Sequence, residues 1–166
     1  MRAPRRSRLA VALFSVATIV GLAACDSDSS ALAPVTEEEA VLVAMEAGIQ
    51  DEFRAELIYQ KVLDDFGLVL PFKNIINAEV RHSEAIAGLY VARGLPVPES
   101  RWTPDDIPGF SSVREACQAG VVAEIENAEI YERYLDLPFP EDVMTVFESN
   151  WAASVERHLP AFERCS

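Results

Sequence analysis

Between residues 36 and 166 the apolar positions recur three and four residues apart, which is the period of an amphipathic helix. No segment shows the sustained alternation of apolar and polar residues that indicates a strand. The pattern predicts an all-α fold with two short connections and one longer, proline-containing loop over residues 95–110. Short connections favour antiparallel neighbours, so we expect an antiparallel four-helix bundle. The predicted helices cover residues 37–66, 72–93, 112–135 and 140–159.

The ends of the predicted helices carry residues that suit helix termini. A hydroxyl residue followed three positions later by glutamate can form a reciprocal capping box, and glycine readily ends a helix. Proline suits the first helical position because that position needs no N–H group. These signals are Thr36 with Glu39, Ser112 with Glu115, Gly67, Gly94 and Pro140.

The first 24 residues have a different pattern, which is typical of a targeting segment. Four arginines precede an apolar run that, at roughly 16 residues, is shorter than the about 20 needed to span a bilayer as a helix. The run ends in Leu22-Ala23-Ala24-Cys25, which resembles the lipobox of bacterial lipoproteins. The resemblance implies a signal peptide over residues 1–24 and a diacylglycerol on Cys25. An ordinary secretory signal is the alternative.

Residues 25–35 are small, polar and proline-containing, so we interpret them as a flexible tether between the lipid and a domain over residues 36–166. The protein would then be exported and anchored to the outer face of the cell membrane. In that oxidising compartment a disulfide between Cys117 and Cys165 is the default expectation. Two unpaired buried thiols are the alternative.

Acidic residues outnumber basic ones by 27 to 14, which gives a net charge of −13. Such a surface repels phosphate backbones, so the charge argues against a nucleic-acid partner. The sequence contains no glycine-rich phosphate loop, nucleophile elbow or paired-cysteine zinc motif. Some of the carboxylates could instead serve as ligands for a cation.

Each predicted helix places at least one ionisable side chain within its apolar stripe. Unpaired carboxylates in a dry core cost several kcal/mol each, and no lysine or arginine lies beside them in these stripes. A divalent cation would compensate the charge, since iron, manganese and zinc accept carboxylate and imidazole ligands. The candidate ligands include both histidines of the chain: Glu52, Glu79, His82, Glu124 and His158.

The sequence also contains a weak internal repeat. Glu52 precedes Tyr59 by the same spacing that separates Glu124 from Tyr131, and an Arg-His pair follows each. These pairs are Arg81-His82 and Arg157-His158. The pattern predicts two helical hairpins related by approximate two-fold symmetry. We interpret the two tyrosines either as core residues or as hydrogen-bond donors to the metal carboxylates.

At these residues the chain resembles the ferritin-like superfamily of di-iron carboxylate bundles, rubrerythrins especially. Those bundles use a Glu from each of two helices and a Glu-x-x-His from each of the other two. A bacterial ferritin-like family of unknown function is more similar still. That resemblance is carried by PFKNIINAEVRHSEA from Pro71, by Gly94-Leu95-Pro96 and by RHLPAF from Arg157. It covers nearly all of the domain.

The fourth helix departs from the ferritin-like pattern. Val155 stands three residues before His158, where a glutamate is expected, and Glu156 falls on the opposite face of the helix. One metal position is therefore expected to lack a ligand, with water, Glu56 or Asn127 to complete it. A single-ion site is the alternative.

Three functions remain open on the sequence. The leading hypothesis is a metal-binding lipoprotein that handles iron or peroxide, in its enzymatic form an oxidoreductase supplied by an external electron donor. The second is non-catalytic binding of zinc or manganese. The third is a helical interaction module without metal. The sequence leaves open whether the protein forms a homodimer.

Overall fold

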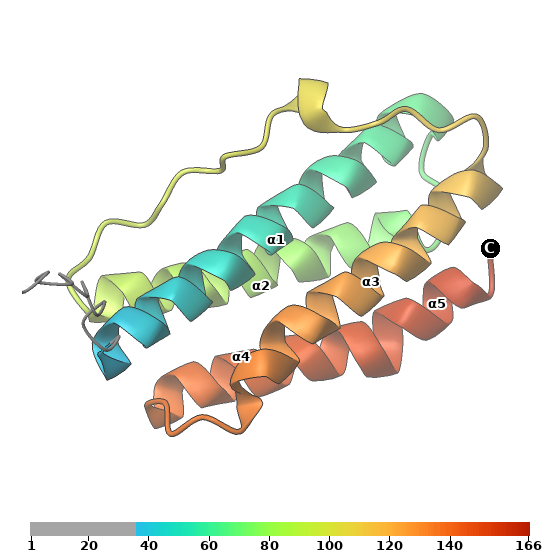
Figure 1. Ribbon diagram of the computed structural model, residues 1–166. Coiled ribbons are helices and arrows are strands. Elements are labelled where there is room, and N and C mark those ends of the chain that lie inside the picture. The colour runs from blue at the N-terminus through green and yellow to red at the C-terminus, as the bar shows by residue number, and fades with distance from the viewer. Residues whose placement is uncertain (1–35) are drawn as a thin grey trace, which may run out of the picture. The chain divides into compact units, whose positions relative to one another are not determined.

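The computed structural model describes residues 36–166; the predicted signal peptide and the whole predicted tether, including Cys25, lie outside the described residues. The described chain is helical and has no strand, as the sequence predicts (Figure 1). The helices are α1 (Glu37–Phe66), α2 (Phe72–Ala92), α3 (Val113–Leu135), α4 (Glu141–Ala153) and α5 (Leu159–Glu163), with the 3₁₀ turn η1 (Pro104–Asp106) and the π turn η2 (Ser154–His158).

Helix α1 has the predicted bounds because both of its ends are chemically defined. The Thr36 hydroxyl accepts from the Glu39 N–H at 3.2 Å, and the Glu39 carboxylate accepts from the Thr36 N–H at 2.8 Å. Gly67 ends the helix with φ of 82°, and its N–H donates to the carbonyl of Leu63. Gly94, which follows α2, also has a positive φ, of 67°. Glycine adopts this left-handed backbone without the steric penalty of a side chain.

Three predicted boundaries need small corrections. The reciprocal capping box at Ser112 is wrong in one half: Ser112 accepts from the Glu115 N–H, but the Glu115 carboxylate accepts from Ser111 instead. Helix α2 ends at Ala92, one residue early, and Pro140 precedes the first residue of α4. Shifts of one residue are expected at helix ends, where intrahelical hydrogen bonds are incomplete.

The last helix is longer than predicted and contains a π turn. Helix α4, η2 and α5 follow one another directly, so the rod continues to Glu163 and does not end near Leu159. Pro160 lacks an N–H group, and in a regular α-helix its ring would contact the carbonyl of Glu156. The wider turn just before Pro160 accommodates the proline. Such turns occur frequently at functional sites, and this one ends at His158.

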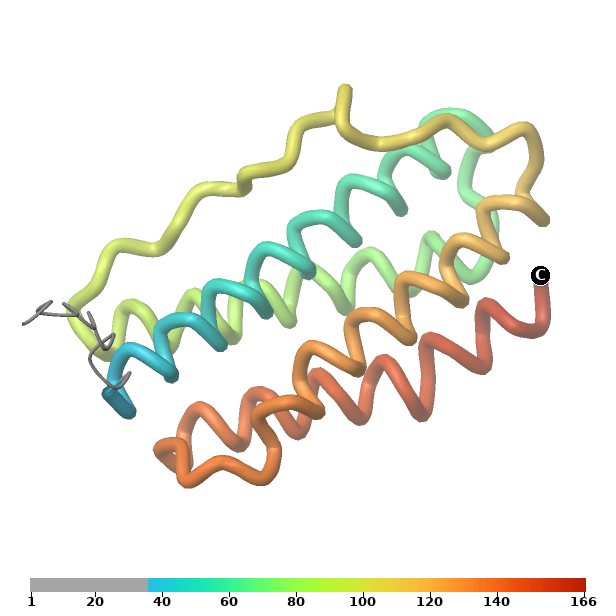
Figure 2. The backbone as a smooth tube through the Cα atoms, in the orientation of Figure 1, coloured from blue at the N-terminus to red at the C-terminus, as the bar shows by residue number. Residues whose placement is uncertain are grey.

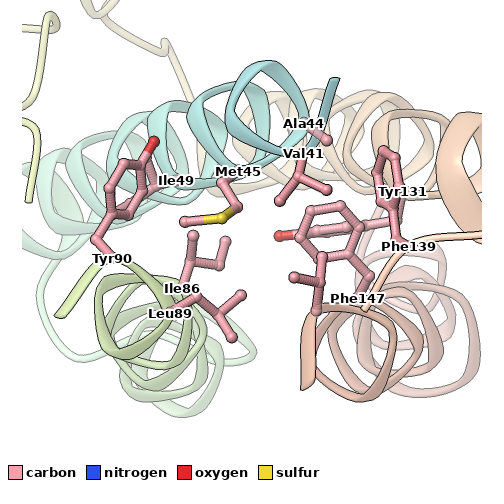
Figure 3. Close-up of a cluster of buried hydrophobic side chains, with 11 residues drawn as sticks. Val41, Ala44, Met45, Ile49, Ile86, Leu89, Tyr90, Tyr131, Phe139 and Phe147 are labelled. Carbon is pink, nitrogen blue, oxygen red and sulfur yellow. The ribbon is translucent and has the colours of Figure 1, made fainter. Parts of the chain in front are cut away.

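The hydrophobic core consists of two clusters, one toward each end of the bundle. In the first, Met45 of α1 packs with Ile86 of α2 and Phe147 of α4 (Figure 3). In the second, the Tyr59 ring packs against Phe72 and Phe162, with ring centroids 5.6 and 5.2 Å away. The bundle consists of four helical rods, which are α1, α2, α3 and the continuous segment α4–η2–α5. Between the clusters every helical rod contributes buried polar residues: Gln50, Glu52, Glu79, His82, Ser83, Glu124, Asn127, Asn150, Ser154 and His158.

The long connection between α2 and α3 runs along α1 (Figure 2). The buried Gln50 side chain holds it in place, with its amide donating to the carbonyl of Glu99 at 2.8 Å and accepting from the Arg101 N–H at 2.9 Å. The Trp102 indole donates to the Gln50 carbonyl at 2.8 Å. This connection therefore covers α1 at the level of the buried polar residues.

Helix α3 and the C-terminal segment approach each other closely and are joined covalently. A disulfide links Cys117 to Cys165, with the two Cα atoms 5.8 Å apart. Gly120 leaves room for the ring of Phe162, since a Cβ added there would lie 2.6 Å from it. Of the helices within residues 36–166, none is both long and apolar enough to span a membrane.

Candidate metal centre

The five residues predicted as metal ligands lie together in the buried polar layer. Their side chains come from all four helical rods: Glu52 from α1, Glu79 and His82 from α2, Glu124 from α3 and His158 from the π turn. All are buried, with exposed fractions of 0% for Glu52, 1% for Glu79, 3% for Glu124, 5% for His158 and 8% for His82. The 3- and 4-residue spacing that places each residue on the inward face of its helix accounts for this arrangement.

The five side chains divide into two groups that share Glu79. One group contains Glu52, Glu79 and His82, and the other contains Glu79, Glu124 and His158. In each group, one ligand atom per residue lies within 4.8 Å of the others. His82 Nδ1 lies 3.0 Å from Glu79 Oε2, while His158 Nδ1 lies 3.0 Å from Glu79 Oε1. The two oxygens of one carboxylate therefore face two different histidines.

The remaining two glutamates occupy equivalent places in the two groups. Glu52 Oε2 lies 3.4 Å from His82 Nδ1, and Glu124 Oε2 lies 3.4 Å from His158 Nδ1. The imidazole rings stack with their centroids 5.5 Å apart. Each group thus has one histidine, one glutamate of its own and one oxygen of Glu79. Because Glu79 belongs to both groups, the three glutamates are distributed evenly between them.

Several ligand-type atoms at this site are buried without a hydrogen-bond partner among the described residues. They are Glu52 Oε2, Glu79 Oε1 and His158 Nδ1. The last two lie 3.0 Å apart, but they do not form a hydrogen bond. Buried polar atoms are almost always satisfied, and leaving one unsatisfied costs about 1–3 kcal/mol. A divalent ion in each group would satisfy these atoms, so the residues present fit a metal.

Mutual attraction shifts the pKa values of these groups. Burial opposes a charged imidazole, but the carboxylates of Glu52 and Glu79 outweigh burial and raise the pKa of His82 to about 10. Burial likewise opposes the charge on His158, yet Glu124 and Glu79 raise its pKa to about 9. For Glu52, burial dominates and raises the pKa to about 7. Without a metal, the charged imidazoles are the groups that compensate the buried carboxylates.

Glu79 shows the opposite balance from Glu52. Burial by itself would raise its pKa, but the two neighbouring imidazoles bring the pKa of Glu79 below the ordinary value for a glutamate. Glu79 is therefore held in its charged form more firmly than Glu52 is. A charged carboxylate between two positions is the arrangement expected of a bridging ligand.

Two tyrosines donate hydrogen bonds crosswise to the outer glutamates. Tyr59 of α1 donates to Glu124 Oε1 of α3 at 2.6 Å, and Tyr131 of α3 donates to Glu52 Oε1 of α1. In both cases Oε1 takes the tyrosine, while Oε2 faces the histidine. Burial is the main reason why both tyrosine pKa values lie well above the ordinary one, and the hydroxyls stay protonated donors. This symmetry follows the internal repeat of the sequence.

Asn127 lies beside the site, with its amide nitrogen toward the carboxylates. Its Nδ2 donates to Asp51 at 2.9 Å and to Glu52 Oε1 at 3.2 Å, and its Oδ1 accepts from Ser154 Oγ at 2.6 Å. Because its amide nitrogen faces Glu52 and its oxygen faces Ser154, Asn127 positions the Glu52 carboxylate in this arrangement. Asn150 extends the network by donating to the Tyr131 hydroxyl at 3.1 Å.

The sequence interpretation missed Asp51, Asn150 and Ser154. Burial raises the pKa of Asp51 to about 6, although Asn127 opposes that rise. Asn150 and Ser154 are four residues apart and Ser154 precedes His158 by four, so all three lie on one helix face. That spacing was available in the sequence as a signal. It was overlooked because neutral polar residues carry no ligand motif.

Glu56 lies outside both ligand groups. Its Oε1 accepts from Ser83 Oγ at 2.6 Å, and burial raises its pKa. The side chain is half-buried, as is Val155, whereas Glu156 is exposed as expected. In this structure, therefore, neither Glu56 nor Glu156 takes the place of the glutamate that the ferritin-like pattern has at position 155.

The fold and the site together define a helical bundle with a buried carboxylate–histidine cluster that can hold divalent metal. Comparison with models of protein families, with curated proteins and with solved structures found no match. The assignment of function therefore depends on the geometry and chemistry of the site.

Proposed function

We propose that this protein is a ferritin-like, antiparallel four-helix bundle that binds two divalent metal ions. The observation that carries the proposal is the division of the Glu79 carboxylate between two ligand groups, one oxygen for each. A single ion would leave the buried glutamate and histidine of the other group without a metal. The equivalence of Glu52 and Glu124 supports two similar metal positions.

We propose iron as the metal and peroxide or oxygen as the oxidant. Carboxylate and imidazole ligands without thiolate suit iron, manganese and zinc, and three protein ligands at a position leave room for a further ligand. Bound iron would supply the redox chemistry. Glu79 would hold the two positions together, the two tyrosines would fix the outer carboxylates, and the buried layer would exclude bulk water. Electrons would come from an external donor.

The proposed location is the outer face of the cell membrane, with the domain anchored through Cys25. The lipobox-like residues at positions 22–25 support it. The Cys117–Cys165 disulfide also supports it, because disulfides persist in exported proteins and are rare in reducing compartments.

Metal stoichiometry tests the proposal directly. Wild-type protein titrated with Fe(II) without oxygen should bind two ions per chain, and Glu52→Gln should bind one. Glu79→Gln should bind less than either, because it removes the negative charge shared by both groups and replaces one of the two ligand oxygens with an amide NH₂ group. Glu84→Gln is the matched control, since Glu84 is exposed on the same helix. If Glu79→Gln binds two ions as tightly as wild type, the shared-ligand site is wrong.

Peroxide consumption tests the redox part. Fe(II)-loaded wild-type protein should consume peroxide faster than Glu79→Gln at equal total iron, while Glu84→Gln should match wild type. Equal rates for all three proteins would remove the enzymatic form of the proposal. The metal stoichiometry would still stand on its own measurement.

A second candidate is a non-catalytic zinc or manganese site. The narrow space beside Glu79 and Glu124 favours it, because the cavity there has a volume of only about 10 Å³. Elemental analysis of protein purified without added metal separates the two candidates. Stoichiometric zinc together with no peroxide consumption would establish the second.

A metal-free helical module is the third candidate. It is favoured by the ability of His82 and His158 to compensate the buried carboxylates when both are charged. In that case a chelator should leave thermal stability unchanged.

A further inference from the structure

A groove lies where the first half of α2 faces the C-terminal segment. Its volume is about 570 Å³, within the range of pockets that accept small organic molecules. Apolar residues from both segments, such as Ile75 and Ala161, form part of its lining. Three arginines also line it: Arg81 from α2, and Arg157 and Arg164 from the C-terminal segment. No aspartate or glutamate is among the lining residues.

Like Arg101 and Arg133, the three groove arginines have no carboxylate partner within residues 36–166. Arg54 and Arg93 form ion pairs with Glu126 and Asp142 at 3.3 and 2.9 Å. Within residues 36–166, none of the three groove arginines has a carboxylate oxygen within 4.0 Å. Three unpaired guanidinium groups around one cavity repel one another. An anion between them would remove that repulsion and accept paired hydrogen bonds.

The groove reaches the candidate metal centre at His158, which is one of its lining residues. The Nδ1 edge of this ring faces Glu79 and Glu124. The opposite edge of the ring carries Nε2, for which no hydrogen bond forms within residues 36–166, so we infer that this edge is available to a molecule in the groove. Metal-binding histidines almost always donate their second ring N–H to a carboxylate, carbonyl or water.

The Arg-His repeat of the sequence explains why two of the arginines line the groove. Arg81 precedes His82, and Arg157 precedes His158. Adjacent helical residues point in directions about 100° apart, so each histidine turns inward while its arginine turns toward the surface. Because the two helices lie side by side, the two arginines line the same groove.

We propose that this groove binds an organic anion, with a carboxylate or phosphate head held by Arg81, Arg157 and Arg164 and an apolar body along the groove wall. The head accepts a hydrogen bond from His158 Nε2, which places the anion beside one metal position. The role next to the metal rests on the function proposed above. The binding of the anion does not.

Calorimetric titration with hexyl phosphate tests the groove, with hexanol as the uncharged counterpart and inorganic phosphate as the head without the body. Hexyl phosphate should bind most tightly and hexanol should not bind. Arg157→Gln and Arg164→Gln should each weaken hexyl phosphate binding about tenfold, as expected for loss of one charge-assisted hydrogen bond. Arg133→Gln is the matched control, because Arg133 is an exposed arginine of α3 outside the groove.

Two results of this titration would overturn the inference. One is the absence of hexyl phosphate binding to wild-type protein. The other is an equal affinity in Arg133→Gln, Arg157→Gln and Arg164→Gln. Because all three arginines are exposed, these variants should keep the wild-type fold, which circular dichroism verifies.

The position of the head is tested by the side-chain ¹⁵N signals of histidine. The chain has two histidines, so the spectrum of the zinc-loaded protein contains two imidazole systems. Hexyl phosphate should shift Nε2 of His158 and leave His82 unchanged, and Arg157→Gln should need about tenfold more hexyl phosphate to reach the same shift. Equal shifts in both rings, or none, would contradict the placement beside His158.

The anion could be a soluble molecule or the headgroup of a membrane phospholipid, and vesicles separate these sources. In a Cys25→Ala background, which removes the predicted lipid attachment, binding to phosphatidylglycerol vesicles that is lost in Arg157→Gln would assign the headgroup. Hexyl phosphate binding without vesicle binding would assign a soluble anion. Calorimetry on metal-free protein keeps this inference separate from metal binding: either can fail while the other holds.

Discussion

Glu79 differs from the other two buried glutamates because each of its oxygens lies 3.0 Å from a different histidine. Glu52 and Glu124 each turn one oxygen to a histidine and the other to a tyrosine. The three carboxylates thus have two distinct environments, and these differences in contacts indicate different roles at the site. Glu79 joins the two groups, whereas each outer glutamate is held in position by a tyrosine from the opposite helix.

Removing one tyrosine hydroxyl should weaken metal binding without removing a ligand. In Tyr59→Phe, Glu124 Oε1 loses its donor, and the carboxylate is free to rotate away from His158. Loss of such an outer hydrogen bond typically lowers metal affinity about 10- to 100-fold. Isothermal titration with Zn(II) should show this loss for Tyr59→Phe and for Tyr131→Phe.

Tyr90→Phe is the control for the tyrosine variants. Its hydroxyl donates to Glu46 at 3.3 Å, and neither residue belongs to the ligand groups. Its Zn(II) affinity should equal that of wild type. If Tyr59→Phe behaves like Tyr90→Phe, the tyrosines serve only as core residues.

The histidines also predict how the stability of the metal-free protein depends on pH. Their folded-state pKa values are about 10 and 9, above the ordinary value of 6.5. Between pH 6.5 and these values only the folded protein keeps the protons, so unfolding releases them. The stabilising contribution is fully present below pH 6.5 and is lost as the pH rises through 9 and 10.

Urea unfolding of chelator-treated protein at intervals from pH 6 to pH 10 measures this dependence. The free energy of unfolding should fall as the pH rises. Saturating Zn(II) should reduce or reverse the fall, because metal binding displaces the two imidazole protons and so strengthens with pH. A flat profile for the metal-free protein would mean that the imidazoles are not charged in the folded state.

At the scale of the helices, the two halves of the bundle place the same types of residue at the buried site, in the same order along the chain. Helices α1 and α3 each supply a glutamate and a tyrosine that meet the other helix, and α2 and the α4–η2–α5 rod each supply a histidine. The halves differ because α2 also supplies Glu79, whereas the last rod has Val155 and a π turn. One shared carboxylate from α2 therefore serves both halves.

The contact between α3 and α5 depends on the absence of a side chain at residue 120. A Cβ at Gly120 would lie 2.6 Å from the Phe162 ring, which is fully buried and packed against Tyr59 and Phe72. Gly120→Ala should destabilise the protein by about 1–2 kcal/mol, because overpacking outweighs the gain in helix propensity. Chemical denaturation measures the difference.

Gly88→Ala is the matched substitution in α2. A Cβ there meets no heavy atom within 4 Å, so only the helix propensity changes. We expect this variant to be more stable by about 1 kcal/mol. Equal effects of the two substitutions would contradict the close approach of α3 and α5.

The sequence predicts a helix end accurately where capping residues define it, and less accurately elsewhere. The bounds of α1 were predicted fully because a capping box and a glycine define them. The last helix was predicted to end near Leu159, but it continues to Glu163, because the π turn before Pro160 accommodates the proline within the helix. Helical spacing predicted that the five ionisable residues face inward. It could not predict that the two oxygens of Glu79 are divided, because spacing defines a face and not the contacts of single atoms.

At the scale of the whole domain, the buried polar layer separates two hydrophobic clusters that each contain residues from all four helical rods. The layer contains three glutamates and two histidines where a bundle of this size would gain stability from apolar packing. Breaking a buried ionic network by removing one partner is strongly destabilising. A bound metal would therefore act as a cross-link between all four rods, in addition to the covalent link between Cys117 and Cys165.

Removal of metal should consequently lower the thermal stability of the whole domain. A metal that binds only the folded state and is present at 100 times its dissociation constant adds about 2.7 kcal/mol. For a domain of this size, that corresponds to a rise of about 10 °C in the melting temperature. Calorimetry of wild-type protein with Zn(II) and with excess chelator should show this difference. The melting temperature should also rise with the Zn(II) concentration.

Glu79→Gln distinguishes a specific cross-link from a general effect of the chelator. This variant keeps the size of the side chain but loses the charge shared by both ligand groups, so its melting temperature should be nearly independent of Zn(II) and chelator. Glu84→Gln should behave like wild type, because Glu84 is exposed and outside both groups. If wild type melts at one temperature with and without chelator, the buried layer is maintained by the charged histidines alone, and the metal-free module becomes the correct function class.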